Sequence, residues 1–350
     1  MADAVVGIVA NPLSGRDIRR LVAKASVFPT AEKANMVQRV ITACAAVSVD
    51  RVLLNTDLGG ISAAVLRALR TRRPSEPRWP DVEFLETERI TQSAADTTEA
   101  VARMRAAGAR VVVCLGGDGT ARVAAAACGD TPLLALSTGT NNAFPRMREA
   151  TVAGLAAGLL ATGAVEPGPP ATRRAPVLEV TAAGRTEIAL VDVAVSAAGH
   201  IGSRALWDPS ALTELYCAFA EPDGIGLSSV AGLLCPSPRT EPDGVALRLG
   251  APDGCPAVVR APIAPGLVAD VGVRDWRPFP SGTTRPIDAE RGVIAVDGER
   301  EIEFRAAAEA APGERPYVRL RPDGPLCVDV PAVLAAAAAR GLLTENGRKA

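Results

Sequence analysis

The stretch VCLGGDGT at residues 113–120 has the pattern of a buried strand that ends in a glycine-rich turn and leads directly into a helix. Gly116, Gly117 and Gly119 carry no Cβ, so the backbone at these positions can approach a phosphate closely. Thr120 adds a hydroxyl group, and the free N–H groups at the start of a helix favour an anion. The stretch therefore predicts a phosphate-binding loop.

Asp118 stands inside this loop, where a carboxylate would repel phosphate unless it has a separate task. Two tasks fit: binding Mg²⁺, or accepting a proton from an attacking hydroxyl group. We therefore predict Asp118 as the catalytic residue and as a candidate ligand for an Mg²⁺ ion that arrives with the phosphates. The alternative is a tight strand-to-helix turn in which Asp118 caps the helix.

The sequence around this stretch alternates strand and helix patterns. Buried-strand patterns occur at 5–10, 51–54, 82–85, 111–115 and 133–136. Helix patterns separate or follow them at 30–47, where Thr30 is a plausible N-cap, and at 61–71, 93–107, 121–127 and 150–162. This order predicts right-handed crossovers and a Rossmann-like, mostly parallel sheet whose ligand crevice lies at the carboxyl ends of its strands.

Two further polar loops follow strands of the same predicted sheet. The first, NPLSG at 11–15, contributes the candidate nucleotide-binding residues Asn11, Ser14 and Gly15. The second, after the strand at 133–136, contributes Thr138, Gly139, Thr140, Asn141 and Asn142. We expect all three loops to meet in one crevice, with donors suited to phosphate and ribose oxygens. They predict a nucleotide triphosphate site without a Walker motif; the alternative for the second loop is an Asn-Asn surface turn.

The chain changes character after residue 162. A proline-rich linker covers 163–176, and short strand patterns separated by Gly, Pro and Asp turns continue to about 330. We therefore predict an α/β nucleotide-binding domain at 1–162 and an all-β, β-sandwich-like substrate domain at 171–328, each with its own core. A helix is expected at 210–219, and the helix at 332–342 is expected to pack back on the first domain.

Composition excludes several classes of function. The 350 residues carry a formal net charge of −1, so no basic surplus exists to bind a nucleic-acid backbone. The longest uncharged apolar stretches, at 152–165 and 330–339, are too short to cross a bilayer. Seven scattered cysteines without CxxC spacing indicate reduced core residues. We expect a cytoplasmic homo-oligomer that binds a small-molecule nucleotide, and neither nucleic acid nor membrane.

Several motifs together resemble a known family. GGDGT at 116–120 resembles the signature shared by NAD kinases and diacylglycerol-type lipid kinases. The loops at 11–15 and 138–142 look like the lipid-kinase version, whereas APIAPG at 261–266 and VDG at 296–298 look like the β-domain of NAD kinases. This mixture is similar to the acetoin catabolism protein X branch of the ATP-NAD kinase-like proteins.

The resemblance implies an NAD kinase/diacylglycerol kinase-like fold and ATP- and Mg²⁺-dependent phosphorylation of a hydroxyl group, with Asp118 as base or metal-linked carboxylate. NAD or NADH is the implied acceptor, in a role linked to acetoin catabolism. Where NAD kinases carry an Asn-Glu pair, this chain has Val191 and Asp192, so the acid is retained and the amide is lost. Asp192 is thus a secondary candidate for the substrate site.

Arg204 is a second such candidate, because its glycine-rich segment would cross the interdomain cleft and bring a guanidinium to a phosphate. The alternative pairs Arg204 with Asp208 in a strand-to-helix connection. Two other functions stay open. The 138–142 loop favours a kinase of a small polyol or lipid hydroxyl, and the lost amide at Val191 favours a nucleotide-sensing accessory protein without turnover.

Overall fold

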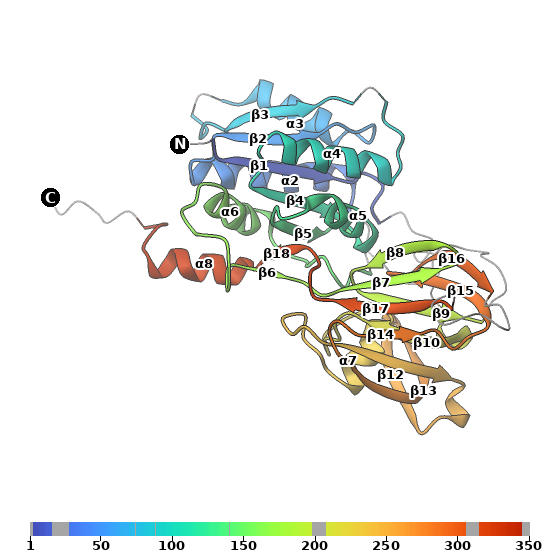
Figure 1. Cartoon of the computed structure of the whole chain (residues 1–350). Helices are drawn as coiled ribbons and strands as arrows, with labels where there is room; N and C mark the ends of the chain where they lie inside the picture. The colour runs from blue at the N-terminus through green and yellow to red at the C-terminus, as the bar shows by residue number, and fades with distance from the viewer. Residues whose placement is uncertain are drawn as a thin grey trace.

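The computed structural model describes residues 3–15, 28–73, 75–87, 89–139, 141–197, 208–305 and 315–344. Two units stand side by side: a parallel sheet covered by helices, and a group of antiparallel sheets (Figure 1). The predicted fold class, an α/β unit followed by a β-rich unit, is confirmed.

The first unit is built on a seven-stranded sheet in the order β3-β2-β1-β4-β5-β18-β6. Its strands are β1 (Val5–Ala10), β2 (Arg51–Asn55), β3 (Asp81–Leu85), β4 (Val111–Gly116), β5 (Leu133–Ser137), β6 (Thr172–Arg174) and β18 (Leu326–Val328). The first five strands are parallel, as their alternation with helices predicts. Their carboxyl ends therefore share one edge of the sheet.

Helices cover both faces of this sheet. They are α2 (Thr30–Ala46), α3 (Ile61–Thr71), α4 (Ala94–Ala106), α5 (Asp118–Cys128), α6 (Ala150–Ala161) and α8 (Val330–Ala339). Alternate side chains of β1 point to opposite faces: Val5 and Val9 pack with α4 and α5, whereas Val6, Ile8 and Ala10 pack with α2, α3 and α6. Burial on both faces explains why β1 and β4 are continuous apolar runs.

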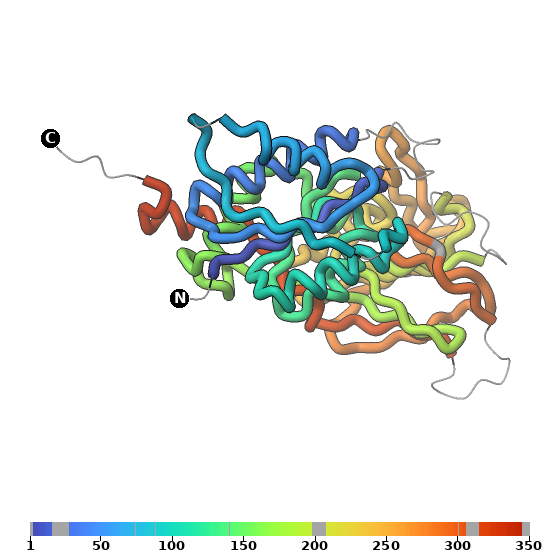
Figure 2. Tube along the Cα trace, turned by 90° about the horizontal axis from the view of Figure 1, so that it is seen from above, coloured from blue at the N-terminus to red at the C-terminus, as the bar shows by residue number. Residues whose placement is uncertain are grey.

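The end of the chain returns to the first unit. α8 packs on α6, at the edge of the first unit that lies away from the second unit (Figure 2). β18 pairs in parallel with β5, and β6 pairs antiparallel with β18. The division at 171–328 assigns these two strands to the second unit, whereas their hydrogen bonds place them in the first sheet.

The second unit holds a seven-stranded sheet in the order β12-β13-β11-β10-β9-β15-β16 and a four-stranded sheet in the order β14-β17-β7-β8. The first comprises β9 (Asp192–Ser196), β10 (Leu212–Cys217), β11 (Gly244–Gly250), β12 (Ala257–Ala264), β13 (Leu267–Phe279), β15 (Arg291–Val296) and β16 (Glu299–Arg305). The second comprises β7 (Val177–Ala182), β8 (Arg185–Ala189), β14 (Thr284–Pro286) and β17 (Tyr317–Arg321). A short helix, α7 (Ser228–Leu234), packs on β11 and β12.

One apolar cluster runs through both units. It joins Met104 and Ala124 of the first unit to Val193, Tyr216 and Phe304 of the second. Two further apolar clusters each stay within one unit, so the shared cluster joins cores that the sequence predicts to be separate.

The predicted helix at 210–219 is also wrong. A 3₁₀ turn at Pro209–Ala211 leads into β10, which pairs antiparallel with both β9 and β11. β10 has the sequence LTELYC and is buried on both faces, so its side chains show no two-residue alternation of apolar and polar positions that would distinguish it from a helix. Among the described residues, no helix is long and apolar enough to cross a membrane.

Candidate functional site

A cavity of about 1180 Å³ opens at the carboxyl edge of the first sheet. It is lined by parts of the segments 10–15, 55–59, 90–97 and 117–123, by Gly139, Asn141 and Asn142, and by Asp297, Glu299 and Glu301. The three polar loops that the sequence predicts to meet thus line one cavity. The second unit completes its wall through the turn and strand that follow β15.

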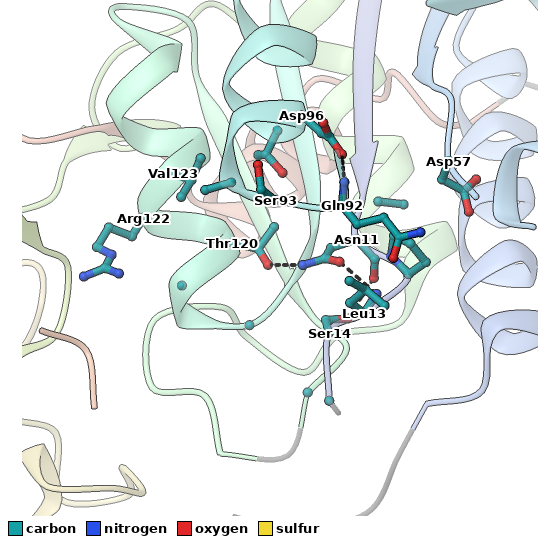
Figure 3. A pocket seen from close by; sticks show the side chains of 18 of the residues that line it. Asn11, Leu13, Ser14, Asp57, Gln92, Ser93, Asp96, Thr120, Arg122 and Val123 are labelled. Atoms are coloured by element: carbon teal, nitrogen blue, oxygen red, sulfur yellow. Dashed lines mark hydrogen bonds between the residues drawn. The ribbon is translucent and has the colours of Figure 1, made fainter. Parts of the chain in front are cut away.

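Asn11 links the loop after β1 to the helix after β4. Its Nδ2 atom donates a hydrogen bond to Thr120 Oγ1 at 2.9 Å, and its Oδ1 atom accepts one from the Leu13 N–H at 2.8 Å (Figure 3). Ser14 connects the same loop to the loop after β5, since its Oγ lies 2.8 Å from Thr138 Oγ1. Gly15 follows with φ +80°, a conformation that favours glycine. Hydrogen bonds between side chains therefore hold the three loops together.

Lys33 supports the 11–15 loop through hydrogen bonds to its backbone. It lies on α2 with 1% of its surface exposed, and its Nζ donates to the carbonyl oxygens of Asn11, Pro12 and Ser14 at 3.2, 3.0 and 2.8 Å. A buried ammonium needs such acceptors, because an unpaired one would lose its hydration without compensation. The sequence analysis missed Lys33. A usable signal was present, since it is one of only three lysines in an arginine-rich chain.

The glycines after β4 are required by close contacts. A Cβ on Gly116 would lie 2.5 Å from the Thr120 side chain, and one on Gly117 would lie 2.9 Å from Asn142 Oδ1. A Cβ on Gly119 would approach Glu299 of the second unit at 3.3 Å. The loop is therefore packed against both neighbouring walls, and α5 begins at Asp118 with its first N–H groups at the cavity.

The Asp118 carboxylate both lines the cavity and holds the next loop. It accepts hydrogen bonds from the Ala143 N–H at 3.1 and 3.2 Å and from the Phe144 N–H at 2.8 Å. These bonds fix the orientation of the carboxylate at the cavity. Asp118 is thus not the helix cap that the alternative predicts: the N-cap of α5 is Gly117, without a side-chain hydrogen bond, and the Asp118 carboxylate binds the loop after β5 instead.

The loop after β5 closes over the site. Asn142 bridges two segments, because its Oδ1 accepts from the Asp118 N–H at 3.3 Å and its Nδ2 donates to Ser137 Oγ at 2.8 Å. Asn141 and Gly139 line the cavity. Thr140 lies outside the described residues.

An acidic wall faces the loops from the second unit. Arg122 of α5 is surrounded by three carboxylates: its Nη2 lies 3.3 Å from Glu301 Oε1 and 3.9 Å from Glu299 Oε2, and its Nε lies 3.8 Å from Asp297 Oδ2. Burial raises the pKa of the Asp297 carboxyl, although the Arg122 guanidinium and backbone N–H groups at 190–192 oppose this rise. None of these residues was predicted from the sequence as a site residue. Asp297 belongs to the VDG motif at 296–298, which entered only as part of the resemblance to NAD kinases.

The structure describes only one of the two secondary candidates for the substrate site, Asp192 and Arg204. Asp192 opens β9 and is buried, with 4% exposed, and its carbonyl oxygen accepts from the Asp297 N–H at 2.9 Å. It supports the wall without being one of the residues that line the cavity. Arg204 lies outside the described residues.

The far side of the cavity is formed by two helix starts. Asp57 accepts from the N–H groups of Ile61 and Ser62 at 3.1 and 2.7 Å and so caps α3. Asp96 on α4 accepts from the Gln92 N–H at 2.7 Å, and Gln92 adopts φ +58°, a rare conformation for a residue with a side chain (Figure 3). These contacts fix the 55–59 and 90–97 walls in place.

The cavity has the size and the donor groups of a ligand site. Its volume exceeds the range of about 300–1,000 Å³ that is usual for ligand pockets. Backbone N–H groups at the start of α5 suit phosphates. Among the described residues, no group of three or more His, Cys, Asp or Glu side chains could hold a metal ion.

Comparison with known proteins defines the class. Residues 6–165 match the model of the ATP-NAD kinase N-terminal domain, and residues 176–313 match the model of the acetoin catabolism protein X C-terminal domain. The chain therefore combines an NAD kinase-like α/β unit with a β-rich unit of that second type.

A curated relative then gives the family. The acetoin catabolism protein X of Cupriavidus necator is 42% identical over 304 residues, which cover 86% of this chain and 84% of the relative. The chain belongs to the acetoin catabolism protein X family. Among solved structures, an NAD kinase from Archaeoglobus fulgidus in complex with ATP is 12% identical, with a TM-score of 0.38 over 84% of this chain and 99% of that one.

Proposed function

We propose that the chain is an ATP- and Mg²⁺-dependent phosphotransferase that acts on a hydroxyl group, with NAD or NADH as acceptor, in a role linked to acetoin catabolism. The observation that carries the proposal is the meeting of the 11–15, 116–120 and 137–142 loops around one cavity, with Asp118 at the start of α5. The match to the ATP-NAD kinase N-terminal domain and the name of the Cupriavidus necator relative support it.

Each part of the site has a task in this reaction. N–H groups at the start of α5 bind the phosphates of ATP, and Mg²⁺ bound to those phosphates neutralises their charge. Asp118 accepts the proton of the acceptor hydroxyl, or orients that hydroxyl for attack in line with the leaving oxygen. The acidic wall at Asp297, Glu299 and Glu301 faces the α5 side of the cavity, so its charge favours hydroxyl or cationic groups of the acceptor over a further phosphate.

A second candidate is a nucleotide-sensing accessory protein. It is favoured by the hydrogen bonds that Asp118 accepts from Ala143 and Phe144, because they give the carboxylate a structural task that needs no turnover.

The experiment is a phosphoryl-transfer screen of the pure full-length protein with ATP and Mg²⁺. The acceptors are NAD, NADH, small polyols and diacylglycerol, and ADP release and phosphorylated product are both measured. Product from NAD or NADH supports the proposal, and product from a polyol or from diacylglycerol alone redirects the acceptor to that class. ATP binding without ADP release or product from any acceptor contradicts the proposal and supports the sensor.

A further inference from the structure

Arg239 of the second unit binds the loop whose Ala143 and Phe144 N–H groups donate to Asp118. Arg239 Nη2 donates to the Ala143 carbonyl oxygen at 2.7 Å, and Nη1 donates to the Phe144 carbonyl oxygen at 2.9 Å. The Arg239 guanidinium also pairs with the Glu221 carboxylate. Its Nε lies 3.0 Å from Glu221 Oε1, and its Nη2 lies 2.9 Å from Glu221 Oε2. Arg239 therefore uses its fork on two partners at once, one in each unit.

Two aromatic rings also contact the Arg239 guanidinium. Its Cζ atom lies 4.3 Å from the centroid of the Phe219 ring and 5.7 Å from that of the Phe144 ring. Only 20% of its side chain and 15% of the Glu221 side chain are exposed. A guanidinium held by a carboxylate and two rings has little freedom to turn, so the two carbonyl groups that it binds are held as well.

The peptide unit between residues 143 and 144 joins this clamp to Asp118. Its carbonyl oxygen, on Ala143, accepts from Arg239, and its N–H group, on Phe144, donates to Asp118 Oδ1 at 2.8 Å. One rigid plane thus has the arginine on one edge and the carboxylate on the other. Hydrogen bonds in such a chain strengthen one another, and rotation of the plane would break both bonds together.

We propose that Arg239 is a positioning residue, which sets the orientation of the Asp118 carboxylate through the 143–144 peptide unit. This inference rests on the proposed function. Arg239, which does not line the cavity, would then contribute to catalysis by fixing the angle at which Asp118 meets the acceptor hydroxyl. A misplacement of about 1 Å at a reacting group costs on the order of 10²-fold in rate, so such a clamp matters for turnover.

The variants Arg239→Met and Arg239→Lys test this role, with Arg146→Met as the matched control. Arg146 also pairs with Glu221, at 2.9 Å, but its side chain is 47% exposed and donates to neither the 143 nor the 144 carbonyl. We expect Arg239→Met to lower kcat at least about tenfold, with the KM for ATP within about threefold of wild type. Arg239→Lys keeps a donor and recovers part of the rate, and Arg146→Met leaves kcat unchanged.

Combining Arg239→Met with Asp118→Asn gives a second test. A merely structural role of Arg239 would not make the two effects on kcat depend on each other. If Arg239 acts through Asp118, adding Arg239→Met to Asp118→Asn lowers kcat by much less than it does in wild type. Full additivity of the two effects overturns the proposal. An unchanged kcat in Arg239→Met also overturns the proposal. This kcat is calculated per ATP-binding site and measured well below the midpoint of unfolding, so that only folded protein is compared.

Amide hydrogen exchange separates this inference from the proposed function. Exchange at the Phe144 N–H, measured by NMR in the full chain, should be at least about tenfold faster in Arg239→Met and unchanged in Arg146→Met. If the wild type transfers no phosphate, the proposed function fails. The contact of Arg239 with the 143–144 peptide unit is then tested by the exchange rate of the Phe144 amide alone. Equal Phe144 exchange in wild type and Arg239→Met overturns the clamp whatever the activity.

Discussion

Gly117 lies where the loop after β4 touches the loop after β5. A Cβ there would lie 2.9 Å from Asn142 Oδ1, so a larger side chain must push Asn142 away and open the bridge between the loops. We expect Gly117→Val to weaken ATP binding at least about tenfold, or about 1.4 kcal/mol, in calorimetry. The fold should survive, because the change falls in a loop at the cavity.

Gly254→Val is the matched control. Gly254 lies in an exposed turn of the second unit, where an added Cβ meets no atom within 4 Å. Unchanged ATP affinity in a folded Gly117→Val protein would remove the glycine loop from the nucleotide site.

At Asp118, charge and shape can be separated. Asp118→Asn keeps an oxygen that accepts from the Phe144 N–H, so the loop should stay folded and ATP should still bind. We expect turnover to fall at least about 10²-fold, the low end for a general base. Steady-state kinetics together with ATP calorimetry measure both effects. Full activity in Asp118→Asn would leave Asp118 only the role of holding the loop after β5.

Residues differ in how visible they are from sequence. Gly116, Gly117 and Asp118 could be predicted as one unit, because a glycine-rich turn between a strand and a helix has a local signature. Arg122 and Glu299 could not, since their contact joins α5 to a strand more than 170 residues later in the chain. No local pattern encodes such a pair.

Among the elements, α2 supports the site through Lys33. Lys33→Met fills a similar volume but leaves the carbonyl oxygens of Asn11, Pro12 and Ser14 without this donor. Each buried acceptor that loses its partner costs about 1–3 kcal/mol. We expect urea unfolding to show a loss of at least about 2 kcal/mol, and calorimetry to show weaker ATP binding as the 11–15 loop loosens.

Asn35→Ala on the exposed side of α2 is the control, and it should change the free energy of unfolding by less than about 0.5 kcal/mol. Wild-type stability and ATP affinity in Lys33→Met would show that α2 does not hold the loop.

Strands and helices of the first unit could be predicted well because each is long enough to show its own period. β1, β2, β4 and β5 are apolar runs bounded by turns, and the helices between them have apolar faces. β10 was missed because burial on both faces removes the alternation that identifies a strand. β6 and β18 have only three residues each, and their partners lie far away in the sequence.

At the scale of the whole molecule, Arg122 joins the two units beside the cavity. Its side chain is 12% exposed and faces Asp297, which is fully buried, and Glu301, which is 14% exposed. Removing one partner of a buried ion pair leaves a charge without compensation. We therefore expect Arg122→Met to lower the free energy of unfolding by about 3 kcal/mol at pH 7.

This loss should depend on pH. Burial already raises the pKa of Asp297 above its ordinary value of 3.8, and without the Arg122 guanidinium that pKa rises further. As the pH falls from 7 to 5, the folded variant takes up a proton at Asp297 and the unfolded chain does not, so the destabilisation shrinks. Urea unfolding at both pH values measures it.

Arg260→Met breaks an exposed ion pair with Asp270 and serves as the control, because it should leave the pH dependence of unfolding as in wild type. An equal loss at pH 5 and pH 7 in Arg122→Met would contradict the pairing of Arg122 with a buried carboxylate.

Transfer of the γ-phosphate of ATP is the most direct test of the assigned site. The measurement is a single turnover, with the full-length protein in excess over ATP labelled in its γ-phosphate, in the presence of Mg²⁺ and either NAD or NADH. We predict that the label moves from ATP to the dinucleotide in one exponential phase, and that this phase slows at least about 10²-fold in Asp118→Asn. Label that stays on ATP while ATP is fully bound would contradict the assignment of the site as a phosphotransferase.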